Sequence, residues 1–160
     1  MNTTNKKKKT SQQTTTALRK RCVKMAKDIS KHLDGYRCCY CGVGRPQRQV
    51  HSHHIFHEGT YISMSADPDN LITLCAHHHQ GGMWGKSNDG FNFHNCPRES
   101  TEWLMEKFPE RYAALKKRSQ LNQHINWENK LGELKSIYGE LINWPVDNSI
   151  WQDTIYLLEL

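Results

Sequence analysis

Apolar residues recur at helical spacing near the start of the chain, where Leu18, Cys22, Met25 and Ile29 are separated by steps of four, three and four. Such steps place side chains on one face of a helix, and Gly35 is a natural end for it. The pattern therefore predicts a helix over residues 15–33. Its outer face carries six basic residues and either lies along a nucleic-acid backbone or is simply solvated. These residues are Arg19, Lys20, Arg21, Lys24, Lys27 and Lys31.

Residues 1–16 lack this periodicity and are rich in Lys, Thr, Gln and Asn. Such a segment buries too little apolar surface to order itself, so we predict a disordered basic tail. Its lysines, Lys6 to Lys9, either contact phosphates or keep the chain soluble. The predicted organisation is a tail at 1–16, a helix within 17–35, a central domain at 36–120 and a helical extension at 121–160.

The middle of the chain predicts two strands and a short helix. Residues 46–55 have the apolar and polar mixture of a strand, and 57–69 end in the turn sequence Ala-Asp-Pro-Asp before Asn70. Leu71 to Leu74 form a short apolar strand. Cys75 then begins a short helix that the Gly81-Gly82 pair would end. The expected fold class is therefore α+β.

Three further helices are predicted towards the C-terminus. Pro97 and Pro109 each open one, after a loop at 83–93. A third follows from a narrow apolar seam that ends before Pro145, and residues 150–158 suggest a short docked helix. The seam either packs on the core or pairs with a second copy as a homodimer. It consists of Trp127, Leu131, Leu134, Tyr138 and Leu141.

Composition limits the kind of protein this is. The chain has 160 residues, of which 36% are hydrophobic, so we expect one domain whose thin core would gain from a bound metal. The formal charge of +6 favours a polyanionic partner, most simply nucleic acid. No apolar run is long enough to span a bilayer, and no secretory signal is recognisable, so we expect a soluble protein with no membrane partner.

The cysteines are expected to remain reduced and to bind metal rather than form disulfides. Cys38 and Cys41 form a Cys-x-x-Cys pair, and Cys75 and His78 form a second spaced pair beyond the predicted hairpin. Two such pairs can close a tetrahedral site, and Zn²⁺ accepts three thiolates and one imidazole. The spacing predicts a structural Zn²⁺ site. The alternative is a set of buried, metal-free cysteines.

A second set of residues resembles the HNH (ββα-metal) nuclease superfamily. The likeness is carried by His53-His54, by Asn70-Leu71 within the sequence DPDNL, by His79 after the second metal pair, and by His94-Asn-Cys-Pro97. It covers roughly residues 36–117 and is greatest to phage recombination nucleases of the NinG (Rap) type. The resemblance implies a ββα-metal core with a zinc knuckle, flanked by N-terminal and C-terminal helices, and a metal-dependent DNA endonuclease.

The resemblance also implies roles for single residues. His53 and His79 would hold a catalytic cation, and His54 would be the general base, provided that the strand ends there, because strand neighbours point to opposite faces. The amide of Asn70 would tie the loop together and orient the base. His94 would be a further ligand, a substrate contact, a helix cap or merely exposed. Relatives usually have Cys at the position of His78, which leaves His77 as the alternative zinc ligand; His51 and His57 flank the site as phosphate contacts or spectators.

Cofactors and partners follow as expectations. Mg²⁺ or Mn²⁺ is expected from availability, although imidazole ligands also suit Ni²⁺, Co²⁺ and Zn²⁺. The substrate would be DNA, including branched recombination intermediates, in the cytoplasm of a bacterial host of a phage or prophage. The competing hypothesis is a zinc-stabilised nucleic-acid-binding module without catalysis. It explains the cysteine pairs and the basic helix, but not the family order of His53, His54, Asn70 and His79.

Overall fold

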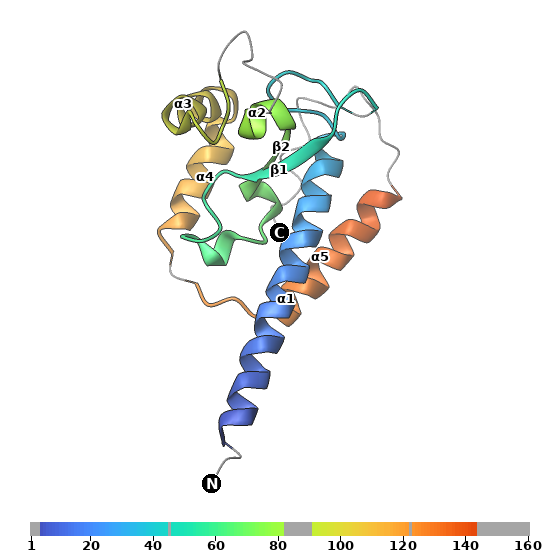
Figure 1. Ribbon diagram of the computed structural model, residues 1–160, viewed down its shortest axis with the longest axis vertical. Coiled ribbons are helices and arrows are strands. Elements are labelled where there is room, and N and C mark those ends of the chain that lie inside the picture. Colours follow the sequence, from blue (N-terminus) through green and yellow to red (C-terminus); the bar gives the residue numbers. More distant parts are fainter. Residues whose placement is uncertain (1–3, 45, 82–90, 122, 144–160) are drawn as a thin grey trace.

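The protein is described by a computed structural model that covers residues 4–44, 46–81, 91–121 and 123–143 (Figure 1). It is an α+β fold, in which helices flank a two-stranded antiparallel hairpin. Within the described residues, no helix has the length and apolar character that crossing a membrane requires. The predicted loop at 83–93, the end of the seam helix at Pro145 and the docked helix at 150–158 lie wholly or mostly outside these residues.

The first helix, α1, is longer than the sequence predicts. It spans Thr4–Leu33 and ends where Gly35 and Tyr36 take positive φ angles of 55° and 56°. The prediction of a disordered tail over residues 1–16 was therefore wrong for the part that begins at Thr4. Lys and Gln are good helix formers, and extending an existing helix is far easier than nucleating one. Figure 1 shows this N-terminal part projecting away from the other described elements.

The hairpin is formed by β1, Val50–His54, and β2, Leu71–Cys75. The register pairs Val50 with Cys75 and His54 with Leu71. The predicted first strand, 46–55, is therefore shorter than expected. The connection between the strands holds two short 3-10 turns, Ile62–Met64 and Pro68–Asn70. The short helix α2, Ala76–Gln80, follows β2 directly and ends at Gly81, which has a φ of 68°.

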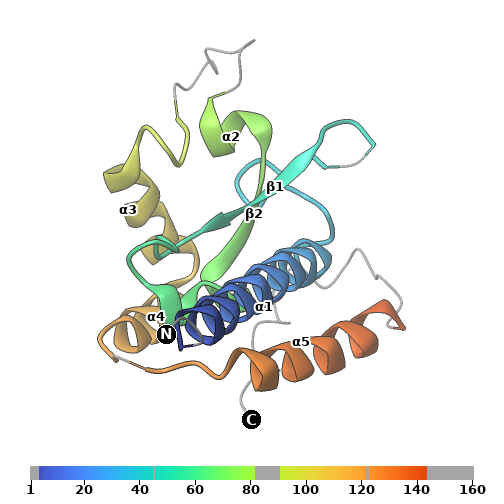
Figure 2. The ribbon, with the colours of Figure 1, turned by 60° about the horizontal axis from the view of Figure 1, so that its bottom comes forward.

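Strand β2 is buried along its whole length and separates two apolar clusters. Leu71 joins the cluster formed with α1, whereas Ile72 and Leu74 join the cluster on the other side, with Phe93 and Leu104. Helices on both faces of a sheet bury its side chains in both directions. Figure 2 shows the hairpin between α1 and α3. The end of α1 is tied to β2, because Asp34 Oδ2 accepts a 2.8 Å hydrogen bond from the Thr73 N–H.

Three further helices lie in the described residues after α2. Helices α3, Pro97–Lys107, and α4, Pro109–Ser119, each begin at a proline. Helix α5, Trp127–Ile142, begins at Asn126, whose side chain accepts hydrogen bonds from two backbone N–H groups of its first turn. The seam of α5 packs on α1 of the same chain, as Figures 1 and 2 show. The sequence left two partners open for the seam, the core of the same chain and a second copy. The structure shows the seam packed within its own chain, so a homodimer through α5 would have to use the outer face of this helix.

We predict that Leu134→Ala lowers the free energy of unfolding by about 2–5 kcal/mol, because Leu134 is fully buried between α5 and α1. Chemical denaturation followed by circular dichroism measures the change. The matched control is Ile142→Ala, since Ile142 lies on the same helix but is 57% exposed, and its effect should stay within about 0.5 kcal/mol. Equal losses in the two variants would contradict the α1–α5 packing.

Candidate metal centres

Two groups of side chains in the described parts of the chain have the composition and spacing of metal sites. The first contains Cys38, Cys41, Cys75 and His78, and the second contains His53, His79 and His94. In each group the ligand atoms lie within 4.8 Å of one another. Both groups draw on the hairpin and α2, so one supersecondary unit organises the two of them.

The turn that carries Cys38 and Cys41 is held closed by its own backbone. Cys38 N–H donates to the Val43 carbonyl at 2.9 Å, and Gly42 N–H donates to the Cys38 carbonyl at 2.7 Å. Gly42 has a φ of 72°, a left-handed conformation that glycine adopts without strain. Cys39 N–H donates to the Thr73 carbonyl at 2.9 Å. The turn is thereby fixed beside β2, and Cys38 and Cys41 face the end of that strand.

Cys75 and His78 complete the first cluster from the junction of β2 and α2. Nδ1 of His78 lies 3.3 Å from the sulfur of Cys75 and 3.6 Å from that of Cys38, and the sulfurs of Cys41 and Cys75 are 4.0 Å apart. A tetrahedral Zn²⁺ with ordinary bond lengths separates two sulfurs by about 3.8 Å and a sulfur from a nitrogen by about 3.6 Å. The donor set and the spacing therefore fit a zinc ion.

Cys38 of this cluster is buried. Burial raises the pKa of the Cys38 thiol to about 12, and the neighbouring Cys75 contributes to the rise. A cation that binds here replaces the thiol protons, so its charge compensates the thiolates that the protein alone disfavours. The ring of Tyr40 packs against that of His78, with the two ring centroids 4.4 Å apart. The structure thus groups His78 with the cysteines, and His77 is not a member of the cluster.

The second cluster arises from the alternation of side chains along β1. His51 and His53 lie on one face of the strand, and this face meets His79 of α2. The ring centroids of His53 and His79 are 5.3 Å apart, and those of His53 and His94 are 5.2 Å apart. Nε2 of His79 lies 3.3 Å from Nε2 of His94, the separation expected when two imidazoles share a cation at about 2.1 Å.

His94 reaches this cluster from the segment between α2 and α3. Phe93 N–H donates to the His78 carbonyl at 2.9 Å, which fixes the segment against α2. Of the four roles that the sequence left open for His94, the structure favours that of a third ligand. The His94 side chain is exposed, so a cation bound to the cluster would be reachable from solvent.

The electrostatics of the imidazoles match a cation site. Burial, together with the neighbouring His79 and His94, lowers the pKa of His53 to about 3. Burial also lowers the pKa of His79 to about 4, with His94, His51 and Lys27 adding to the effect. Both rings are therefore neutral near pH 7 and have a nitrogen lone pair to offer. Neutral imidazole is the form that binds metals.

His54 has different partners from its neighbour His53. Its Nε2 lies 2.9 Å from the Ser65 carbonyl oxygen and 3.5 Å from Glu58 Oε2. A carbonyl only accepts hydrogen bonds, so Nε2 carries the proton and Nδ1 has the lone pair. Burial lowers the pKa of His54, while the Ser65 hydrogen bond and Glu58 oppose that change. His54 is the last residue of β1. At the end of a strand, a side chain is no longer restricted to the alternating directions of the strand interior.

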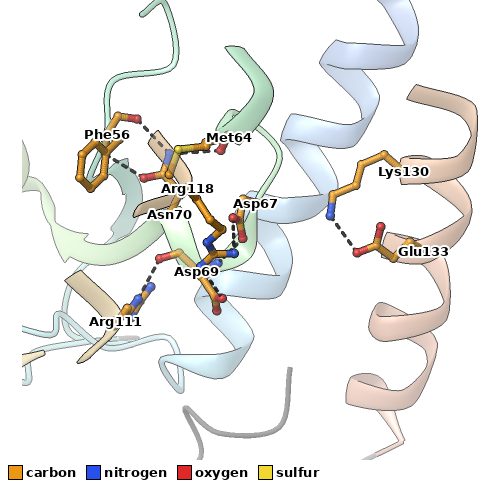
Figure 3. Close-up of polar contacts among 9 residues, drawn as sticks. All are labelled: Phe56, Met64, Asp67, Asp69, Asn70, Arg111, Arg118, Lys130 and Glu133. Atoms are coloured by element: carbon orange, nitrogen blue, oxygen red, sulfur yellow. Dashed lines mark hydrogen bonds and ion pairs between the residues drawn. The ribbon is translucent and has the colours of Figure 1, made fainter. Parts of the chain in front are cut away.

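Asn70 ties the loop between the strands together, as Figure 3 shows. Its Oδ1 accepts from the Phe56 N–H at 2.8 Å, and its Nδ2 donates to the carbonyls of Phe56 at 2.9 Å and Met64 at 3.1 Å. Asn70 is fully buried. The carbonyl that holds His54 belongs to Ser65, the residue after Met64, so the amide of Asn70 fixes the backbone that orients His54.

Helix α4 holds the same turn from outside. Arg118 binds Asp67 at 2.7 Å and Asp69 at 3.0 Å, and Arg111 donates to the Asp69 carbonyl at 2.8 Å (Figure 3). Two guanidinium groups thus fix the Asp-Pro-Asp sequence that precedes Asn70. The sequence showed the turn residues but gave no sign that α4 would supply these partners.

The two histidines that flank the site in the sequence, His51 and His57, lie in different surroundings. His51 stacks on His79, with ring centroids 5.6 Å apart and an interplanar angle of 10°. His57 is exposed, and its Nδ1 accepts a hydrogen bond from the Gly59 N–H at 3.2 Å. His51 is therefore a neighbour of the second cluster, whereas His57 belongs to the loop. Sequence reasoning missed Ser65 and Glu58 as partners of His54, because only the folded loop brings them there.

We predict that Cys75→Ser removes bound zinc and lowers the melting temperature, because a serine hydroxyl is a poor replacement for a thiolate ligand. Elemental analysis of the purified protein measures zinc per chain, and thermal unfolding measures stability. Cys96→Ser is the matched control, since Cys96 is outside both clusters and its replacement should leave zinc content unchanged. Wild-type protein that contains no zinc would contradict the site.

We predict that Asn70→Ala lowers the free energy of unfolding by about 2–4 kcal/mol, because it removes the Asn70 partner of the Phe56 N–H and of the Phe56 carbonyl and leaves the Met64 carbonyl with the Asp67 N–H alone. Urea titration gives this value. Asn129→Ala is the control, since Asn129 is exposed on α5. If the two substitutions cost the same, the loop does not depend on the Asn70 amide.

Comparisons of this chain with protein-family models, with curated proteins and with solved structures found no match. The likeness to HNH nucleases thus stands on the motif residues quoted above, and the arrangement of these residues carries the functional argument.

Proposed function

We propose that this protein is a metal-dependent DNA endonuclease of the HNH type. The observation that supports the proposal best is the cluster of His53, His79 and His94, together with a neighbouring histidine, His54, whose tautomer is fixed by a backbone carbonyl. A binding module needs neither feature. Hydrolysis of a phosphodiester needs both a cation and a base.

His53, His79 and His94 would hold the cation, and their low pKa values keep two of the three rings neutral for this purpose. When bound, the ion would supply positive charge against the scissile phosphate as charge develops on its oxygens. Mn²⁺, Co²⁺, Ni²⁺ and Zn²⁺ suit three nitrogen ligands better than Mg²⁺ does, because Mg²⁺ prefers oxygen. Cellular availability nevertheless favours Mg²⁺ or Mn²⁺ as the working ion.

His54 would act as the general base. With its Nε2 proton donated to the Ser65 carbonyl, Nδ1 can take a proton from a water molecule. The water oxygen forms a bond to phosphorus, and the bond from phosphorus to the 3′ oxygen breaks. That oxygen leaves with a proton from solvent. The products are a 5′-phosphate and a 3′-hydroxyl, as the resemblance to the superfamily implies.

The cluster of Cys38, Cys41, Cys75 and His78 would hold a structural Zn²⁺. It lies where the first turn, β2 and α2 meet, and α2 also carries His79. Zinc would therefore stabilise the helix that presents a catalytic ligand, without taking part in the reaction. The competing function, a zinc-stabilised nucleic-acid-binding module, uses this cluster and the basic α1 but gives no role to the three-histidine cluster.

We predict that His54→Ala reduces plasmid nicking by about 10²–10⁴-fold, because the reaction loses its positioned base. Zinc content and circular dichroism should not change. His124→Ala is the control, since His124 is exposed in the connection before α5 and should nick like the wild type. The assay is run with Mg²⁺, Mn²⁺, Co²⁺ and Ni²⁺ in turn, and with a chelator that stops the reaction.

Two results would reject parts of this proposal. Undiminished nicking by His54→Ala would remove the assigned base while leaving a nuclease. DNA binding by the wild type with no strand breaks under any ion would favour the binding module instead. Linear, nicked, single-stranded and four-way-junction substrates in the same assay would show whether branched DNA is preferred.

A further inference from the structure

Four lysines form one stripe along α1. Lys20, Lys24, Lys27 and Lys31 follow each other at steps of four, three and four, so they share one face of the helix. The buried residues of α1, among them Cys22 and Ile29, occupy the opposite side and pack towards α5. Lys20 and Lys24 are exposed, and Lys27 and Lys31 are partly exposed. The stripe is therefore available to a partner.

The part of the stripe around Lys27 lies beside the histidines. The hydroxyl of Ser52 in β1 donates to the Lys27 carbonyl at 2.9 Å, which fixes α1 to the strand that carries His53 and His54. Lys27 Nζ lies 4.0 Å from Glu58 Oε2, and the same oxygen is 3.5 Å from His54 Nε2. Through Glu58, Lys27 therefore lies close to His54.

The positive charge of the stripe is only partly balanced. Lys31 pairs with Asp28 at 3.2 Å, and Lys27 lies near Glu58. Partly exposed pairs of this kind contribute little free energy and exchange readily for another anion. Within the parts of the chain that the structure describes, Lys20 and Lys24 have no acidic partner. Two full charges and two weakly paired ones therefore lie along this face.

We propose that this stripe follows one backbone of the duplex DNA that the protein cuts and leads it to His54; the inference rests on the proposed nuclease function. From Lys20 to Lys31 the helix rises about 16 Å. A DNA strand advances about 3.4 Å per phosphate along the duplex axis and also winds around it, so a straight helix of this length meets only a few phosphates of one strand. A stiff helix that presents regularly spaced ammonium groups suits such a regular, rigid row of charges.

The composition of the helix favours a duplex over a single strand. Sites for single-stranded nucleic acid place aromatic rings among their basic residues, so that the bases stack on them. Residues 14–33 of α1 contain no Phe, Tyr or Trp. Contacts from lysine to phosphate carry no sequence information. The stripe would therefore position the duplex without selecting its sequence.

We predict that Lys20→Gln/Lys24→Gln weakens binding of a 40-base-pair duplex by at least about tenfold at 0.1 M salt and lowers the salt slope of log K by about 2, because two phosphate contacts are lost. Fluorescence anisotropy without added divalent ion measures binding. Lys107→Gln/Lys135→Gln is the matched control. It removes the same charge from exposed positions on α3 and α5, and its salt slope should equal that of the wild type.

Equal effects of the two double variants would overturn the stripe, since only net charge would then matter. Tighter binding of a single strand than of the duplex would overturn the duplex assignment. Nicking assays distinguish a failure of the DNA-binding stripe from a failure of the proposed nuclease function. If the wild type nicks DNA and the Lys20/Lys24 variant binds and nicks equally well, the stripe fails and the nuclease stands. If the variant loses binding but the wild type never cuts, the stripe stands and the nuclease fails.

Discussion

The pairing of β1 with a completely buried β2 is the constraint on which the rest of this structure depends. The two buried faces of β2 meet different partners, so a slip of one residue would move Ile72 and Leu74 from the cluster with Phe93 to the side of α1. The register then decides where every β1 side chain goes. His53 meets His79 and His94, while His54 turns to the Ser65 carbonyl. Two neighbouring residues of one type thus acquire different surroundings and different chemistry.

Both candidate metal clusters use the point at which β2 becomes α2. Cys75 ends the strand, and His78 and His79 lie on successive positions of the short helix. His78 faces the cysteines and His79 faces β1, because adjacent helical positions point about 100° apart. A five-residue helix has little stability of its own. A cation bound to the cysteine cluster would hold it, and would thereby also fix His79 of the second cluster.

The loop between the strands is held by polar contacts as well as by buried apolar residues such as Met64 and Ala66. Asn70 joins its two ends from inside, and Arg118 and Arg111 clamp the turn from α4. Buried polar groups of this kind are stabilising when every partner is satisfied and costly when one is removed. The loop carries Ser65 and Glu58, the partners of His54, so the proposed base depends on contacts that reach as far as α4.

The sequence alone determined the elements and the ligand types. Helical spacing revealed α1 and α5, the turn residues located the hairpin loop, and the Cys-x-x-Cys pair indicated the first metal site. It misjudged the start of α1, because a polar segment attached to a stable helix can extend it without burying a face. It also left open the choice between His77 and His78, the surroundings of His94 and the partner of the α5 seam. Only the tertiary structure placed His78 among the cysteines, His94 beside His79 and the seam on α1, since each depends on which face of one element meets another, and local sequence periodicity does not contain that information.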